Sequence, residues 1–179
     1  MDDLKKFAVG TIITLVIGGT AYSVTQEDVV NNFAQDTGLT QEQAEQYITG
    51  MNEDELDTWD NVGKEMVQEG TDVISIAAGI DCTNYEYEWE SVSLSCAQGK
   101  SQLQTLGQNT LNLGRSYLKL STDTATSADM EQTIRDIDTL NASLRLSVVT
   151  ANFHSTEIEE IRNTNSYNKA VLQAALGGE

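Results

Sequence analysis

Few residues of this chain have the types and spacing that catalysis requires. His154 is the only histidine, and nucleophilic catalysis needs a base beside the nucleophile. It lies among polar neighbours in a predicted helix, so we interpret it as a surface residue. Glu157 follows one turn later and could share a metal with it, but helical di-iron sites need two Glu-x-x-His motifs and further glutamates. The sequence therefore predicts no catalytic residue, no metal site and no cofactor.

Two other ligand-binding patterns are incomplete. The carboxylates between Glu53 and Asp60, in EDELDTWD, lack the alternating oxygen ligands and the central glycine of an EF-hand calcium loop. We interpret this cluster as the solvated start of a helix. The chain also has no phosphate-binding glycine motif and no Cys-x-x-Cys pair. These observations favour a protein that is not an enzyme.

The best candidate site lies between the only two cysteines, Cys82 and Cys96. Aromatic and acidic residues alternate there: Tyr85, Glu86, Tyr87, Glu88, Trp89 and Glu90. A period of two places the rings on one side of an extended segment and the carboxylates on the other. Because Tyr and Trp are typical anchors of protein interfaces, we predict that these six residues bind a partner. The alternative is that the rings cover the open end of a helical bundle.

An apolar run near the N-terminus determines the predicted location. Residues 7–26 carry no charge over about twenty positions, which is the length that a helix needs to cross a membrane. We predict that residues 1–24 form a membrane anchor in contact with the bilayer; the alternative is a signal peptide cleaved near Ala21. Gly10, Thr14 and Gly18 are four residues apart, so on a helix they would share one face and let a second helix approach closely in lipid.

Charged residues around this run predict its orientation. Lys5 and Lys6 precede it, and the next basic residue is Lys64. The positive-inside rule then places the N-terminus in the cytoplasm and the bulk of the chain in the periplasm or outside the cell. Because such compartments permit disulfides, we predict a bond between Cys82 and Cys96.

The net charge narrows the range of partners. The chain has 28 acidic and 10 basic residues, which gives a formal net charge of -18. Such a surface repels phosphate backbones, so nucleic acid is not an expected partner. The acidity suits either a saline habitat or a basic partner surface.

The elements that position these residues are predicted to be helices. Thr25 and Thr40 each begin a segment with the spacing of a capping box, and Gly38 and Gly50 end these two short helices within residues 25–50. Longer helices are expected over about 53–80, over about 97–121 and in the last 40 or so residues, from their apolar periodicity.

Apolar residues in the longer segments recur with a period near seven. One stripe contains Trp59, Val62, Met66, Val73, Ile76 and Ile80, and a second contains Leu103, Leu106, Thr110, Leu113, Tyr117 and Leu120. Gly107 and Gly114 flank the second stripe one heptad apart, where they could admit a neighbouring helix. Such helices must pack together. The predicted fold is all-α, with an N-terminal transmembrane helix and then, in residues 51–179, a helical bundle or coiled-coil-like hairpin whose loop 81–96 is closed by a disulfide.

Two classes of function fit these features. The first is a non-enzymatic, membrane-anchored structural or adaptor subunit of an extracytoplasmic assembly, such as an envelope complex, a virion or a surface filament. It would associate with other protein subunits, including copies of itself. The alternative is an extracytoplasmic ligand-binding or sensor-type helical module. Sensors of that type usually continue through a second membrane helix, and no second apolar span is present in this sequence.

Overall fold

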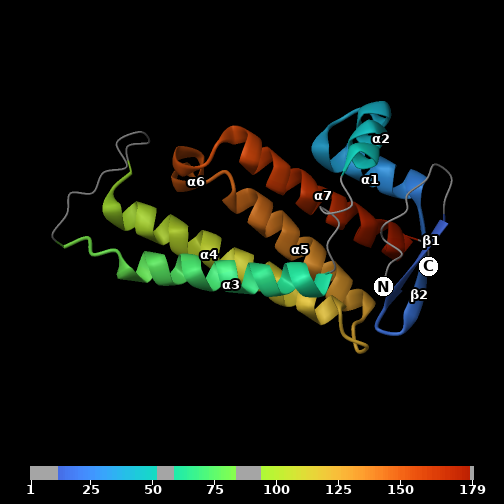
Figure 1. Cartoon of the computed structure of the whole chain (residues 1–179), viewed down its shortest axis with the longest axis horizontal. Helices are drawn as coiled ribbons and strands as arrows, with labels where there is room; N and C mark the ends of the chain where they lie inside the picture. The colour runs from blue at the N-terminus through green and yellow to red at the C-terminus, as the bar shows by residue number, and fades with distance from the viewer. Residues whose placement is uncertain (1–11, 52–58, 84–93, 178–179) are drawn as a thin grey trace.

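The computed structural model describes residues 12–51, 59–83 and 94–177. Within these ranges the chain forms a two-stranded hairpin followed by helices (Figure 1). The elements are β1 (Ile12–Ile17), β2 (Thr20–Thr25), α1 (Gln26–Thr37), α2 (Gln41–Gly50), α3 (Trp59–Gly79), α4 (Cys96–Leu120), α5 (Ser127–Ser143), α6 (Ser147–Asn152) and α7 (Ser155–Gly177). The prediction of a mostly helical chain is confirmed, and the N-terminal strands depart from it.

The N-terminal hairpin replaces the predicted membrane helix. Gly18 and Gly19 have φ of 57° and 75°, and they form the two-residue turn between antiparallel β1 and β2. Glycine adopts such angles without strain, which makes a Gly-Gly pair a strong hairpin signal. The flanking residues are rich in β-branched side chains, which favour strands. No helix among the described residues is long and apolar enough to cross a membrane.

The small residues predicted to pack membrane helices therefore have other places. Thr14 lies in β1 and Gly18 in the turn, where a side chain would overlap the backbone of Ala125. Gly10 lies outside the described residues. Burial in the hairpin has a period of two: Ile17 and Val24 are 1% exposed, whereas Val16 is 61% exposed. One face of the hairpin thus belongs to the core. The predicted membrane anchor over residues 1–24 is not supported, because its described part, from residue 12 onwards, forms strands and not a helix.

The two short helices begin and end at the predicted residues. The Thr25 side chain accepts a hydrogen bond from the backbone N–H of Asp28, and Gly38 ends α1 in the left-handed conformation. Thr40 and Gln43 form a reciprocal capping box at the start of α2. These caps satisfy backbone donors that the first turn of a helix leaves unpaired.

Helices α3 and α4 lie side by side as an antiparallel hairpin (Figure 1). Their contact is lined by glycines on both sides: Gly63 faces Gly114, and Gly70 faces Gly107. A Cβ atom at Gly70 would lie 2.5 Å from the backbone N of Leu111 and 2.7 Å from the carbonyl O of Gly107. The prediction that Gly107 and Gly114 admit a neighbouring helix is confirmed. The hairpin is closed by the predicted disulfide, with the Cα atoms of Cys82 and Cys96 5.7 Å apart.

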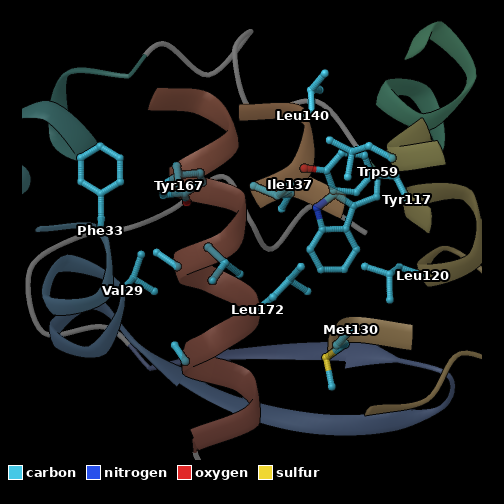
Figure 2. Close-up of a cluster of buried hydrophobic side chains, with 14 of the residues drawn as sticks. Val29, Phe33, Trp59, Tyr117, Leu120, Met130, Ile137, Leu140, Tyr167 and Leu172 are labelled. Carbon is cyan, nitrogen blue, oxygen red and sulfur yellow. The ribbon is translucent and has the colours of Figure 1, made fainter. Parts of the chain in front are cut away.

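The core is centred on the C-terminal half of α7. Figure 2 shows this helix between Phe33 of α1 on one side and Ile137 of α5 on the other, with Tyr117 of α4 beyond. Phe33, Ile137 and Tyr117 are fully buried, as is Leu172 of α7 itself. The predicted stripe of α4 contributes Leu106, Leu113, Tyr117 and Leu120 to buried positions. The predicted apolar stripe of α4 is confirmed at these four positions.

Candidate functional site

The apolar stripe of α3 packs against the core only in part: Val62 and Met66 contact the core, whereas Met66 and Val73 also line an open cleft. Of its residues only Trp59 is buried, and Ile76 is 63% exposed. The reason is geometric: α3 turns its glycine face to α4, so the stripe beside that face is left with incomplete cover. Met66 and Val73, seven residues apart on the same side of α3, line a cleft of about 740 Å³.

The floor and the walls of the cleft come from different helices. In Figure 1, α5 lies between α7 and the α3–α4 pair. Leu106, Leu144 and Val149, from α4, the end of α5 and α6, are buried beneath the cleft. The opposite wall is formed by Ile158 and Ile161 of α7, with Phe153 just before that helix. The remaining lining residues are three carboxylates and Tyr47, Thr110, Leu140, Thr164 and Asn165.

Large apolar side chains remain exposed at the edge of this cleft. Phe153 is 47% exposed and Ile161 43% exposed, while Val149 below them is 1% exposed. Isolated exposed apolar residues are common, but a cluster above an apolar floor is typical of a binding surface. Ile76 extends the apolar surface of α3 one turn beyond Val73.

The edge of the cleft is acidic. Glu69 and Asp72 stand on the α3 wall and Glu160 on the α7 wall, and no basic residue is among the described residues that line the cleft. Burial raises the pKa of Glu69 above its usual 4.5, and the neighbouring carboxylate of Glu65 raises it further. Asp72 accepts a hydrogen bond from the Gln68 side chain at 2.9 Å. A positive charge placed here would relieve the repulsion between Glu69 and Glu65.

A second, polar depression of about 300 Å³ lies between α1, α5 and α7. Beside it the ammonium group of Lys169 contacts Asp36 at 2.5 Å and Asp138 at 2.6 Å. Burial lowers the pKa of Lys169, but the hydrogen bonds to the two carboxylates outweigh it, so that the net effect is a raised pKa. Ser166 also donates to Asp36. These charges satisfy one another and hold α7 against its neighbours.

The predicted site residues are described only in part. Cys82 and Cys96 are joined, as predicted. The partner-binding residues Tyr85, Glu86, Tyr87, Glu88, Trp89 and Glu90 lie outside the described residues, so their role stays a prediction. His154 is exposed, and its backbone N–H donates to the Glu157 carboxylate at 2.9 Å, an interaction that caps the start of α7. In the described ranges, no group of three His, Cys, Asp or Glu residues is arranged to hold a metal ion.

Sequence reasoning missed the cleft, although one of its signals was present. The α3 stripe was recognised, but periodicity shows which face is apolar and not what covers it. The opposite wall was not predicted because one helical segment was expected over the last 40 or so residues. Residues 127–177 instead form three helices, and Phe153 lies at the second break.

Comparison with known proteins gives no match. No protein-family model fits the chain, and no curated protein or solved structure is significantly similar to it. The cleft, its apolar walls and its acidic edge are therefore the basis for inferring a function.

Proposed function

We propose that this chain is a non-enzymatic adaptor or structural subunit of an extracytoplasmic assembly, in which the cleft receives a segment of another protein. The observation that carries the proposal is the pair of half-exposed apolar residues, Phe153 and Ile161, above an apolar floor. The described lining contains no histidine or cysteine that would support a catalytic reading. Its apolar and acidic groups are suited to recognition.

A partner would gain binding free energy from the apolar area that it covers. Complete burial of a Phe or Ile side chain contributes about 1.5–3 kcal/mol. Because Phe153 and Ile161 are already half covered, a partner that completed their burial would gain about 1 kcal/mol from each. Met66 and Val73, both half-buried, would add to this from the other wall. Aromatic anchors set in an apolar pocket are typical of the residues that dominate interface energies.

The disulfide supports the proposed compartment. Cys82 and Cys96 are bonded, and structural disulfides persist in oxidising environments such as the periplasm and the cell exterior. An exported adaptor also accords with the net charge of -18, which keeps an isolated subunit soluble until it meets its partner.

A second candidate function is supported by the size of the cleft. Small-molecule sites occupy about 300–1,000 Å³ and often lie between the helices of bundles, and this cleft measures about 740 Å³. A ligand-binding or sensor module would therefore use the same walls. Native mass spectrometry of the purified chain separates the two, because a small ligand adds a small discrete mass and a protein partner adds a whole subunit.

The adaptor proposal is tested with a double variant, Phe153→Ser with Ile161→Ser. We expect it to leave the native assembly and to elute as a free subunit when the complex is isolated from cells that produce it. The control is Val16→Ser, which removes an apolar side chain that is even more exposed, at 61%, from the hairpin. That variant should remain in the assembly, and both proteins should keep the wild-type circular dichroism spectrum. If the double variant still co-elutes with the assembly, the cleft is not the docking surface.

A further inference from the structure

The carboxylates of the cleft lie on both of its walls. Glu69 and Asp72 belong to α3, and Glu160 belongs to α7. All three are exposed, so their charges face whatever occupies the space between the walls. The apolar side chains of both walls lie in the same cleft. An occupant that satisfies both features must be apolar on one side and positively charged on another.

The shape of the site favours a helix as the occupant. The walls and the floor come from helices and from the residues that flank them, Leu144 and Phe153, and the only described sheet, β1 with β2, contributes no residue to the cleft. A strand would therefore find no edge to pair with, whereas an amphipathic helix can lay its apolar face into such a groove. Met66 and Val73 are seven residues apart, about 10 Å along α3. This distance matches apolar anchors at positions i and i+7 of a bound helix.

We infer that the occupant of the cleft is a cationic amphipathic helix of a partner protein. Its apolar residues would insert between Met66 and Val73 on one wall and Phe153 and Ile161 on the other. Its Lys or Arg residues would meet Glu69, Asp72 and Glu160. The inference rests on the proposed function and adds the chemistry of the partner.

Charge disfavours the main competing occupants. A second copy of this chain would bring another net charge of -18 towards an acidic edge, and the two copies would repel each other. Nucleic acids and anionic lipid surfaces are repelled for the same reason. A basic segment is instead attracted from a distance and positioned by the carboxylates on the two walls.

The test uses three synthetic peptides and the full chain. The first has Leu at i, i+3, i+4 and i+7 and Lys elsewhere; the second has Glu in place of every Lys; the third contains the residues of the first in an order without a helical apolar face. Binding is measured by fluorescence anisotropy at low salt and again at roughly 1 M salt, where the Debye length falls to about 3 Å. The binding of a small cationic amphiphile, dodecyltrimethylammonium, is also measured, at concentrations below those at which it forms micelles.

Matched variants separate the cleft from the general acidity of the surface. The cleft variant carries Glu69→Gln, Asp72→Asn and Glu160→Gln. The control variant removes the same number of charges from exposed residues that do not line the cleft, through the substitutions Glu27→Gln, Glu42→Gln and Asp123→Asn. We expect the first peptide to bind the wild type, to lose at least tenfold in affinity for the cleft variant and to lose less than about threefold for the control, because that control only lowers the overall potential.

The outcomes distinguish this inference from the proposed function beneath it. Equal losses in the cleft and control variants, or equal binding of the Lys and Glu peptides, would overturn the cationic helix. If the Lys and Glu peptides bind equally but both lose affinity when Phe153→Ser and Ile161→Ser are introduced, the adaptor function is still supported. A third outcome is that the double variant changes the affinity of no peptide but lowers the affinity of dodecyltrimethylammonium. In that case the helix inference and the adaptor function both fail, and a small-ligand site replaces them.

Discussion

Replacing Gly70 with Ala tests how closely α3 and α4 are packed. A Cβ atom at this position would lie 2.5 Å from the backbone N of Leu111, 2.7 Å from the carbonyl O of Gly107 and 2.9 Å from the Cα of Leu111. All three atoms belong to backbone, so no side chain can rotate away to make room. The two helices must therefore separate, or the variant must bear the clash.

Two opposing effects determine how much Gly70→Ala changes the unfolding free energy. Ala is favoured over Gly inside a helix by about 1 kcal/mol. Overpacking a well-packed contact costs about 1–3 kcal/mol, and the cost should fall at the upper end because backbone atoms cannot yield. The net loss of unfolding free energy is then about 2 kcal/mol. For a domain of this size, that loss lowers the thermal midpoint by about 4–8 °C.

The same helix provides a matched control. Gly79, the last residue of α3, has nothing within 4 Å of the position that its Cβ would occupy. Gly79→Ala should therefore keep or slightly raise the thermal midpoint. Differential scanning calorimetry of both variants measures the difference. If Gly70→Ala is as stable as Gly79→Ala, the helices are not held at glycine contact distance and the explanation for the uncovered α3 stripe fails.

Three further predictions concern the charges and the disulfide. Lys169→Met should lower the unfolding free energy by about 2 kcal/mol, because it leaves the mostly buried carboxylate of Asp36 without its cation. Urea titrations at neutral pH measure this loss. An unchanged urea midpoint would show that the ion pair is dispensable. Breaking the Cys82–Cys96 bond with reductant should cost about 3 kcal/mol, and thermal melts with and without reductant that coincide would refute this estimate. Glu69→Gln should raise the unfolding free energy at pH 7 by a few tenths of a kcal/mol. Because the folded-state pKa of Glu69 is raised, its ionisation opposes folding as the pH rises above 4.5. The stability advantage of the variant should therefore vanish below that pH. A stability advantage that persists at low pH would point to another cause.

The parts of the fold that followed from the sequence depend on local rules. The capping residues Thr25 and Thr40 and the stop at Gly38 each act within one helical turn, so their spacing was sufficient. The disulfide was expected because the chain has only two cysteines and a predicted exported location, although that location had been inferred from a membrane helix that the described residues do not form. Gly107 and Gly114 showed one side of a close helix contact, although Gly63 and Gly70 opposite them were not recognised.

The parts of the fold that could not be predicted from the sequence depend on tertiary context. The apolar run 7–26 has the length of a membrane span, and the membrane prediction rested on that length; the Gly18-Gly19 pair within the run was not recognised as a turn signal. The breaks between α5, α6 and α7 contain no Gly or Pro. The first of them is stabilised by a hydrogen bond that the N–H of Val148 donates to Gln102 of α4 at 3.0 Å, a contact 46 residues away along the chain.

The candidate site could not be derived for a related reason. Its walls come from residues 66–73 and 153–165, which are far apart in the sequence and become neighbours only when α7 docks in the core. The exposure of Phe153 and Ile161 is a property of that packing. Nothing in their local sequence distinguishes them from the buried Val148 and Val149.

The proposed occupant of the cleft between α3 and α7 is a cationic amphipathic helix. The most direct test is methyl NMR of the full chain, labelled at Ile, Leu and Val, during titration with the Leu and Lys peptide. If the peptide binds in the cleft, shift changes should be concentrated at Val73, Ile158 and Ile161, with none at Ile137, which is fully buried in the core. Shift changes that gather at Val16, or that are absent from the cleft while the peptide binds, would contradict this proposal.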